Sequence, residues 1–276
     1  MMKWEEPREQ EAAEAEGSVW KKRVWWGLVT FCTVILVFSA FHVWRTVHQS
    51  RQENDTFLEL AKLAEHEGAA ESGLTGTDGK ESGDQAKQSR YAVIAGQNPD
   101  FAGWLKIDRT VIDYPVMYTP EDVQYYIRRD FYGKESVSGT PFIGDHCNVD
   151  SQGMIIYGHN MKNDTIFGAL DEYANRDYWR EHPVIRFSTV EEEREYEVFA
   201  AFRTRLLYEN EEGFRYYEYV GDLTEESFGE FVEQAEAAAL YDTGIRPEYG
   251  DQFLMLSTCS YHTKNGRFVV AARRTR

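Results

Sequence analysis

The candidate nucleophiles of this chain are its three cysteines, of which Cys259 has the most informative neighbours. Cys259 closes the apolar run FLMLSTC, the polar loop SYHTKNG follows, and the apolar run RFVVAA begins at Arg267. If the two runs pair as antiparallel strands, the thiol and the guanidinium leave the sheet at the same end. A neighbouring guanidinium favours a reactive thiolate, or donates hydrogen bonds to the oxyanion of acyl transfer. The spacing alone leaves open that Cys259 is a small core residue and Arg267 a surface cation.

A thiol nucleophile needs a base, and the chain has seven histidines. His159 ends the apolar run GMIIYGHN, where a strand would carry the imidazole to the rim of a sheet. A neutral imidazole there can take or give a proton during acyl transfer. His262, three residues after Cys259, is the second candidate, and we favour His159 because a strand end specifies its position better. The other five lie in an apolar segment, in a linker or in loops: His42, His48, His66, His146 and His182.

Runs of β-forming residues, separated by turn-forming Gly, Asn, Asp and Pro, must carry these side chains. Their patterns predict strands at Thr110–Met117, Gly153–Tyr157, Val184–Phe187, Glu195–Thr204, Gln252–Thr258 and Arg267–Ala272. Helical spacing predicts helices within Thr165–Tyr178 and Leu223–Leu240, the second capped by Asp222 or Thr224. This mixture favours a closed or nearly closed β-barrel with flanking helices over a βαβ layer fold. The sequence has no glycine-rich phosphate loop and no CxxC pattern, so we expect neither a cofactor nor a metal.

Residues 24–44 form an uncharged and strongly apolar segment of 21 residues. As a helix it would be about 31 Å long, which matches the hydrocarbon core of a bilayer. Tryptophans lie near both of its ends, and Lys21, Lys22 and Arg23 precede it, so the positive-inside rule predicts a cytoplasmic N-terminus. A buried core helix and a cleaved signal peptide are the alternatives. The segment lacks the polar stripe of the first and a clear A-x-A cleavage site for the second.

The apolar segment divides the chain into a cytoplasmic tail (1–23), a transmembrane anchor (24–44), a linker (45–90) and an extracytoplasmic domain (91–276). The linker is rich in Gly, Ser, Asp and Lys, with one short amphipathic helix predicted within residues 57–64. We therefore expect a single-pass protein of the cell membrane whose folded domain lies outside the cell. With 30 Lys+Arg against 47 Asp+Glu, the net charge is −17, which argues against a nucleic-acid partner. Only three cysteines occur, so a disulfide-stapled scaffold is excluded.

The combination of YGHN (157–160), LSTC (256–259) and Arg267 eight positions later resembles the sortase family. Sortases are membrane-anchored cysteine transpeptidases of Gram-positive bacteria. The likeness extends from Phe101 to Ala272. It includes GWLKID (103–108), IDYPVM (112–117), DFYGK (130–134) and IIYGHNMKNDTIFGAL (155–170). The phrase LYDTG (240–244) and the helical insertion before it are similar to class B sortases in particular.

The resemblance implies a mainly β fold, a closed eight-stranded sortase-type barrel with flanking helices, preceded by a single transmembrane helix. It implies that Cys259 is the nucleophile, His159 the acid and base, and Arg267 the residue that positions substrate or stabilises the oxyanion. Ser257 and Thr258 are expected to line the substrate groove. The expected reaction cleaves an NPxTN-like sorting signal of a surface protein after its Thr, through a thioester. An amine of a peptidoglycan precursor (lipid II) or a pilin Lys then accepts the protein.

Three other functions stay open at this point. A pilin-polymerising sortase is less favoured, because no second apolar span follows the domain and no aromatic-acidic lid precedes Phe101. A Cys–His wall peptidase would release its product instead of joining it to an amine, and a tethered binding module would not need the thiol. The segment FIGDHCNVD (142–150) departs from the family's usual aromatic- and Arg-containing loop. We expect its Cys147 to be an idle thiol, unpaired with Cys259, and assign no role to His146.

Overall fold

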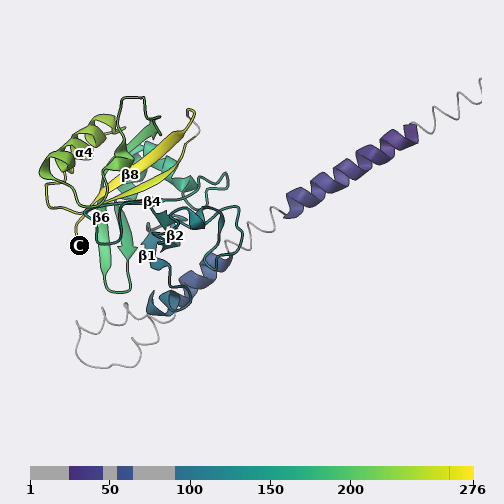
Figure 1. The fold of residues 1–276 in the computed structure, drawn as a ribbon, viewed down its shortest axis with the longest axis horizontal. Helices are drawn as coiled ribbons and strands as arrows, with labels where there is room; N and C mark the ends of the chain where they lie inside the picture. The colour runs from purple at the N-terminus through teal and green to yellow at the C-terminus, as the bar shows by residue number, and fades with distance from the viewer. Residues whose placement is uncertain (1–24, 46–54, 65–90, 261) are drawn as a thin grey trace, which may run out of the picture. The chain divides into compact units, whose positions relative to one another are not determined.

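The computed structural model describes residues 25–45, 55–64, 91–260 and 262–276, drawn as a ribbon in Figure 1. The chain divides into two units, one ending at Gln49 and the other beginning at Ser50. The first contains an apolar helix and the second a β-barrel domain. The predicted cytoplasmic tail, Val24 and most of the predicted linker lie outside the described residues.

The apolar helix is Trp25–Arg45, 21 residues with a mean hydropathy of 1.9 in its most apolar part, none of which is buried. Its length and composition therefore fit a membrane span and not the buried core helix that was the alternative. The hydroxyls of Thr30 and Thr33 donate to the carbonyls of Trp26 and Val29, at 2.7 and 2.8 Å. Both hydroxyls are thus satisfied within the helix, as a membrane span would require.

Eight strands close into a barrel in the order β1-β2-β3-β4-β7-β8-β6-β5, the fold that the sequence predicts. The pairs β2–β3 and β4–β7 are parallel, and the others are antiparallel. The strands are β1 Phe101–Lys106, β2 Asp113–Met117, β3 Phe142–Ile143, β4 Gly153–Tyr157, β5 Val184–Ser188, β6 Glu193–Arg205, β7 Phe253–Cys259 and β8 Gly266–Arg274.

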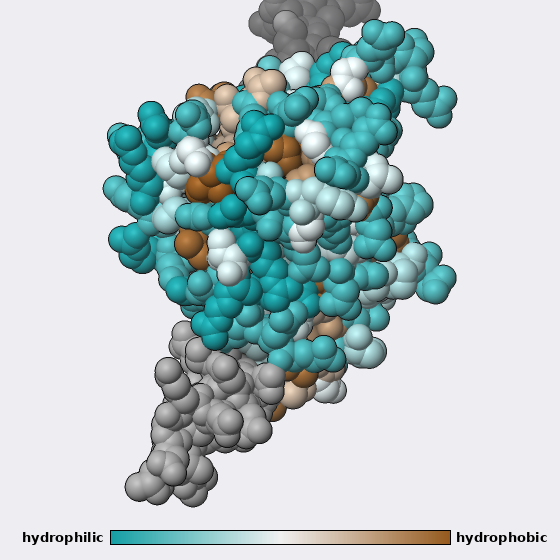
Figure 2. All heavy atoms as spheres, turned by 90° about the vertical axis from the view of Figure 1, so that its left-hand side faces the viewer, coloured by the Kyte–Doolittle hydropathy of each residue, from teal (hydrophilic) through white to brown (hydrophobic). Residues whose placement is uncertain are grey.

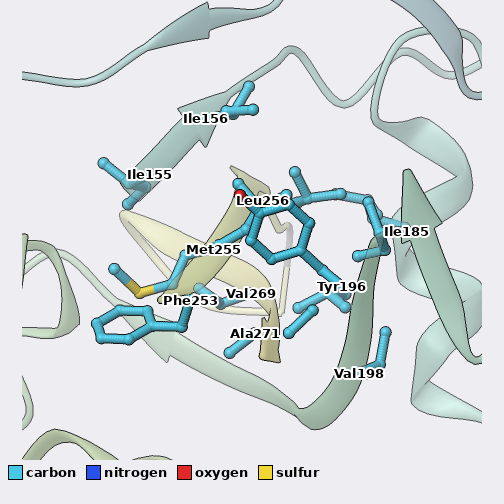
Figure 3. Close-up of a cluster of buried hydrophobic side chains, with 14 of the residues drawn as sticks. Ile155, Ile156, Ile185, Tyr196, Val198, Phe253, Met255, Leu256, Val269 and Ala271 are labelled. Atoms are coloured by element: carbon cyan, nitrogen blue, oxygen red, sulfur yellow. The ribbon is translucent and has the colours of Figure 1, made fainter. Parts of the chain in front are cut away.

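The contrast between surface and interior explains the apolar runs of β4, β7 and β8. The face of the barrel domain in Figure 2 is mostly hydrophilic, with hydrophobic residues in separate spots. Inside, Figure 3 shows side chains from β4, β5, β6, β7 and β8 converging, among them Ile155, Ile185, Tyr196, Leu256 and Val269. These five are at most 2% exposed. Because packed interiors are dense and resist displacement, the strand ends beyond this core have well-defined positions.

The helices cover the barrel from outside. They are η1 Tyr125–Arg128, η2 Gly168–Ala174, α3 Arg176–Glu181, η3 Tyr216–Glu218 and α4 Glu225–Ala238. Thr224, one of the two predicted caps, begins α4 with a capping box to Ser227. Inside α4, Phe231 stacks on Phe253 of β7 with ring centroids 4.5 Å apart. The single helix predicted within residues 165–178 is instead η2 and α3, because Asn175 leaves helical geometry (φ −95°, ψ 123°) and caps α3.

Three local differences from the predicted strands have physical causes. β2 begins at Asp113 and not at Thr110, because residues 107–112 form a turn closed by a 2.9 Å bond from Ile107 N to Ile112 O. β1 was not predicted because its pattern is broken at Gly103, where a Cβ atom would lie 2.7 Å from the Phe187 ring. β3 has two residues, too few to show a period.

Residues 55–64, assigned to the linker by the sequence, form a helix that packs on the barrel. Phe57, Leu60 and Ala64 are 4%, 1% and 5% exposed. The Phe57 ring meets that of Tyr114 edge-on, with centroids 5.2 Å apart. The folded unit therefore takes in this helix as well as the predicted domain.

Candidate active site

Cys259 and Arg267 face each other across the β7–β8 hairpin, as the sequence predicts. β7 ends at Cys259, and the hairpin closes with a 2.9 Å bond from Ser260 N to Gly266 O. Only glycine fits at position 266, since a Cβ atom there would lie 2.3 Å from the Ser260 carbonyl oxygen. The tight turn therefore brings a thiol and a guanidinium together on neighbouring strands.

The parallel pairing of β4 with β7 brings His159 level with Cys259 along the strand direction. The last residues of this β4–β7 pairing are Tyr157 and Ser257, and Gly158 N donates to Ser257 O at 3.2 Å. His159 stands two residues beyond Tyr157, just after the end of β4, and Cys259 stands two residues beyond Ser257, at the end of β7. Since neighbouring strands lie about 4.8 Å apart, the order β4-β7-β8 places His159, Cys259 and Arg267 in one row at one end of the barrel. All three are half-buried.

The His159 imidazole has surroundings that favour its neutral form. Burial is the largest cause of its lowered pKa, and the Arg128 guanidinium on η1 adds to it, while a hydrogen bond with the Ile127 backbone acts in the opposite direction. Its Nε2 atom is buried and has no hydrogen-bond partner among the described residues. A neutral imidazole with an unoccupied nitrogen can accept or deliver a proton.

A pocket of about 280 Å³ opens beside this row. Its lining includes Ile127, Phe142, Asp145, His159, Leu206 and Arg267. These residues come from η1, β3, the segment after β3, and the ends of β4, β6 and β8. Apolar walls with a few converging polar groups are typical of a site that binds a ligand in a defined orientation.

Ser257 and Thr258 do not line a groove with their side chains, contrary to the expectation from the sequence. They are 0% and 2% exposed. The Ser257 hydroxyl is 2.8 Å from the Tyr216 hydroxyl, and Thr258 Oγ1 donates to Gly158 O at 2.8 Å. Burial raises the pKa of Tyr216 to about 12, so its phenol stays protonated. Both hydroxyls are therefore held in the packed interior, that of Ser257 against Tyr216 of η3 and that of Thr258 against the backbone that follows β4.

The other sequence candidates lie apart from this row. Cys147 is 5% exposed, its Sγ lies 3.5 Å from Gly144 O, and burial raises its pKa to about 11, so it is a protonated thiol. His146 is exposed, 3.4 Å from Asp145. His262 lies in the exposed hairpin turn, with Nδ1 2.9 Å from Ser260 Oγ. Cys32, Cys147 and Cys259 are all free of disulfides. Within the described residues, no group of three or more His, Cys, Asp or Glu could hold a metal ion.

Three residues of the site were not singled out from the sequence. Arg128 approaches His159 from η1, and Tyr216 supports Ser257 from η3. Asn160 donates from Nδ2 to the carbonyl of Cys259 at 2.7 Å. Of the three, Asn160 alone stood inside a motif that the sequence marked. Arg128 and Tyr216 lie in short 3₁₀ turns that carry no periodic signal.

The comparison with known families agrees with this architecture. A family model described as the sortase domain matches residues 105–275. The chain belongs to the sortase family. Among curated proteins, this sortase is 27% identical to sortase B of Listeria monocytogenes over 244 residues, 87% of this chain and 92% of the relative. At the level of the family it is therefore a cysteine transpeptidase, with relatives of the B type.

Solved structures agree on the fold of this sortase. A Staphylococcus aureus sortase B–substrate complex matches with a TM-score of 0.67 at 19% identity, over 83% of this chain and 99% of that one. Sortase B from B. anthracis in complex with AAEK1 matches with a TM-score of 0.58 at 27% identity, over 68% of this chain and 84% of that one. The eight-stranded barrel of this chain is therefore the sortase B fold.

Proposed function

We propose that this sortase is a class B-like transpeptidase in which Cys259 is the nucleophile, His159 the acid and base, and Arg267 the residue that stabilises the oxyanion or positions the substrate. The observation that carries the proposal is their single row on β4, β7 and β8. The pocket lined by His159 and Arg267 supports it, since a substrate held there would lie against that row. So does the lowered pKa of His159, which keeps the imidazole neutral near neutral pH and therefore able to accept a proton.

The proposed reaction has two halves. In the first, His159 takes the proton of the Cys259 thiol, Sγ attacks the carbonyl carbon of a substrate Thr, and the guanidinium of Arg267 stabilises the oxyanion. The C–N bond breaks as His159 protonates the leaving amine, which leaves a thioester on Cys259. In the second half, an acceptor amine attacks the thioester and His159 takes its proton. The C–S bond breaks, His159 passes that proton to Sγ, and the thiol is restored with a new amide bond in the product.

The substrates follow from the class B relatives. We propose that the donor is an NPxTN-like sorting signal at the C-terminus of a surface protein, cleaved after Thr. The acceptor is an amine of a peptidoglycan precursor, lipid II, with a pilin Lys as the second option. The anchor at residues 24–44 would hold the enzyme in the cell membrane with its N-terminus in the cytoplasm. The donor and acceptor would then meet at the outer face of that membrane.

The direct test incubates the full chain, in detergent, with sorting-signal peptides and separate amine acceptors, and follows the products by mass spectrometry. A transpeptidase forms an acyl-enzyme and a ligated product whose mass includes the acceptor. A ligated product on a pilin-Lys peptide alone would indicate pilus assembly, and hydrolysis without ligation a Cys–His peptidase. The absence of any acyl-enzyme with every signal of this kind would contradict the proposal.

Replacing the proposed nucleophile gives the first prediction. Cys259→Ala should abolish both the acyl-enzyme and turnover, because no other described thiol lies in the row. The midpoint of thermal unfolding should change little, since Cys259 is half-buried at a strand end. Cys147→Ala is the matched control and should keep turnover. The reverse pattern, an inactive Cys147→Ala variant and an active Cys259→Ala variant, would refute the assignment.

Two arginines of the same strand give the second prediction. Arg267→Ala should lower kcat by about 10²-fold or more, the usual effect of losing an oxyanion donor. Arg273→Ala should not, because Arg273 pairs with Phe253 at the far end of the hairpin and its guanidinium lies 3.5 Å from Glu197. Steady-state kinetics with one peptide and one acceptor measure both. Equal losses would show that the position of Arg267 beside Cys259 is not what matters.

A further inference from the structure

Asn160 follows His159, the proposed base, and its side chain is hydrogen-bonded to the backbone of Cys259, the proposed nucleophile. Its Nδ2 donates to the carbonyl oxygen of Cys259 at 2.7 Å and to Oδ2 of Asp171 at 3.0 Å. An amide nitrogen carries two hydrogens, so both bonds can form at once. The other oxygen of Asp171, Oδ1, is buried without a hydrogen-bond partner in the described part of the chain. One amide therefore ties the end of β4 to the end of β7 and to η2.

The carbonyl of Cys259 needs such a donor because of its register. Ser260 N donates to Gly266 O at 2.9 Å, which makes Ser260 and Gly266 a hydrogen-bonded pair. In an antiparallel ladder the neighbouring pair, Cys259 and Arg267, is then non-hydrogen-bonded. The Cys259 carbonyl therefore points away from β8, toward β4. Regular β4–β7 pairing has already ended at Tyr157 and Ser257, so the Asn160 side chain replaces the missing backbone donor.

The same bonds fix His159 relative to Cys259. On one side of His159, Gly158 N donates to Ser257 O at 3.2 Å, and Gly158 O accepts from Thr258 Oγ1 at 2.8 Å. On the other side stands Asn160, bonded to Cys259. His159 is thus flanked by contacts with β7 on both sides. This arrangement sets the height of the imidazole along the strand direction.

The segment that follows Asn160 is held in an unusual conformation. Ile166 is 1% exposed and has a φ of 56°, a value that a β-branched residue rarely adopts. Its N donates to the Tyr114 hydroxyl at 3.1 Å, and it forms an isolated β-bridge with Asn160. The next residue, Phe167, donates from its N to His159 O at 3.0 Å. Strain of this kind persists only where the surroundings over-determine the backbone, which here keeps the Asn160 amide in place.

We propose that Asn160 is a positioning residue of the transpeptidase. Through the Cys259 carbonyl it sets the height of the thiol relative to the His159 imidazole, without touching substrate itself. This inference rests on the proposed roles of Cys259 and His159. Without the contact, the end of β7 shifts, and a misplacement of about 1 Å costs roughly 10²-fold in rate. Substrate binding in the pocket is unaffected, so the loss falls on kcat and not on KM.

The effects of the two Asn160 hydrogen bonds, to Asp171 and to the Cys259 carbonyl, can be separated by exchanging the side chains at positions 160 and 171. Asn160→Asp removes both donors and sets one carboxylate beside another. The double variant Asn160→Asp/Asp171→Asn restores the bond between the two positions, because the amide introduced at 171 donates to the carboxylate introduced at 160. It leaves the Cys259 carbonyl facing a carboxylate. Asn175→Asp is the matched control, since Asn175 is an exposed cap that accepts from Asp177 N at 2.9 Å, as a carboxylate also does.

The measurements are kcat, KM and the thermal unfolding midpoint of the full chain in detergent, with one sorting-signal peptide and one amine acceptor. Asn160→Asp should lower kcat by roughly 10²-fold with KM within about twofold of the parent. The double variant should regain part of the loss in the unfolding midpoint but none of the loss in kcat, and Asn175→Asp should match the parent. Recovery of kcat in the double variant would overturn the proposal, since the bond to Asp171 would then be what matters. An unchanged kcat in Asn160→Asp would overturn it as well.

A readout that needs no substrate keeps this test separate from that of the proposed function. In a chain carrying ¹³C-carbonyl cysteine, the Cys259 resonance, assigned with Cys259→Ala, reports the hydrogen bond to its carbonyl. It should move in Asn160→Asp and in the double variant, and stay in Asn175→Asp. A resonance that does not move refutes the contact. If the variants shift the resonance as expected but the parent chain forms no acyl-enzyme, the proposed function of Cys259 is contradicted. The positioning role then fails with it.

Discussion

At the scale of the residue, burial and a neighbouring cation together favour the neutral form of the His159 imidazole. Arg128 on η1 lowers its pKa, and Arg267 on β8 and Asp145 after β3 line the same pocket. Burial remains the largest cause of the lowered pKa. The ordinary value is 6.5, and the folded value lies below it. As the pH falls, His159 is therefore protonated in the unfolded chain before it is protonated in the folded one. The free energy of unfolding decreases for this reason as the pH falls below about 6.5.

Arg128→Gln tests the contribution of that cation. Removing a positive charge near an imidazolium should raise the pKa of His159 toward its ordinary value. The measurement is the titration of the His159 ¹³Cε1 resonance in histidine-labelled protein, assigned with His159→Gln. Arg129→Gln is the neighbouring control, because that guanidinium lies 4.4 Å from the Tyr125 ring centroid and contributes nothing resolvable to the His159 pKa. A pKa that falls or stays in Arg128→Gln would show that η1 does not act on His159 through its charge.

At the scale of the element, the helix at residues 55–64 extends the barrel's core beyond the predicted domain. Leu60 and Ala64 join a second core cluster with Tyr91, Phe101 and Trp104. Tyr91 stacks on Trp104 with ring centroids 6.1 Å apart. The helix therefore covers β1, a strand that would otherwise expose a large aromatic side chain. Its apolar face has a structural role even though it lies before the predicted domain boundary.

Two leucines of this helix give a prediction with a built-in control. Leu60 is 1% exposed and Leu58 is 50% exposed. Leu60→Ala should lower the free energy of unfolding by about 2–5 kcal/mol, because it opens a cavity in the second cluster. Leu58→Ala should change it by less than about 0.5 kcal/mol. Denaturant unfolding followed by tryptophan fluorescence measures both. Equal and small effects would mean that the helix does not stabilise the barrel.

At the scale of the whole molecule, two units of opposite character share one chain. The helix Trp25–Arg45 is apolar on all sides, whereas the described barrel domain presents the mostly hydrophilic face of Figure 2. The net charge of −17 comes almost wholly from residues after that helix. Such acidity favours the solubility of the barrel domain and says little about its substrate.

Phase partition in a detergent that separates on warming tests this division. The full chain should enter the detergent-rich phase, and a chain beginning at Ser50 should stay in the aqueous phase and keep transpeptidation. Leu36→Arg in the middle of the helix should weaken partition, since a central Arg costs about 2.5–3.5 kcal/mol on insertion. Leu36→Ile keeps the apolar surface and should behave as the parent does. A full chain found in the aqueous phase would exclude a membrane anchor.

The sequence by itself determined the features that are local. A 21-residue apolar segment, the strands β4, β7 and β8, and the pairing of Cys259 with Arg267 are all set by residues within one element or one hairpin. Hydrophobic periodicity and turn chemistry act over such short distances, so they can be detected along the chain. The strand pattern also favoured a closed or nearly closed barrel, and the motif likeness to sortases added its eight strands, which the structure confirms.

The tertiary structure alone decided what depends on residues far apart in the chain. Asn160 and Cys259 are 99 positions apart, and only the parallel β4–β7 pairing brings the amide of one to the carbonyl of the other. The burial of Ser257 and Thr258 and the docking of residues 55–64 likewise follow from how the barrel closes. The amphipathic pattern of residues 57–64 indicates a face to bury but not what covers it, because burial and hydrogen-bond partners are properties of the packed molecule and not of a segment.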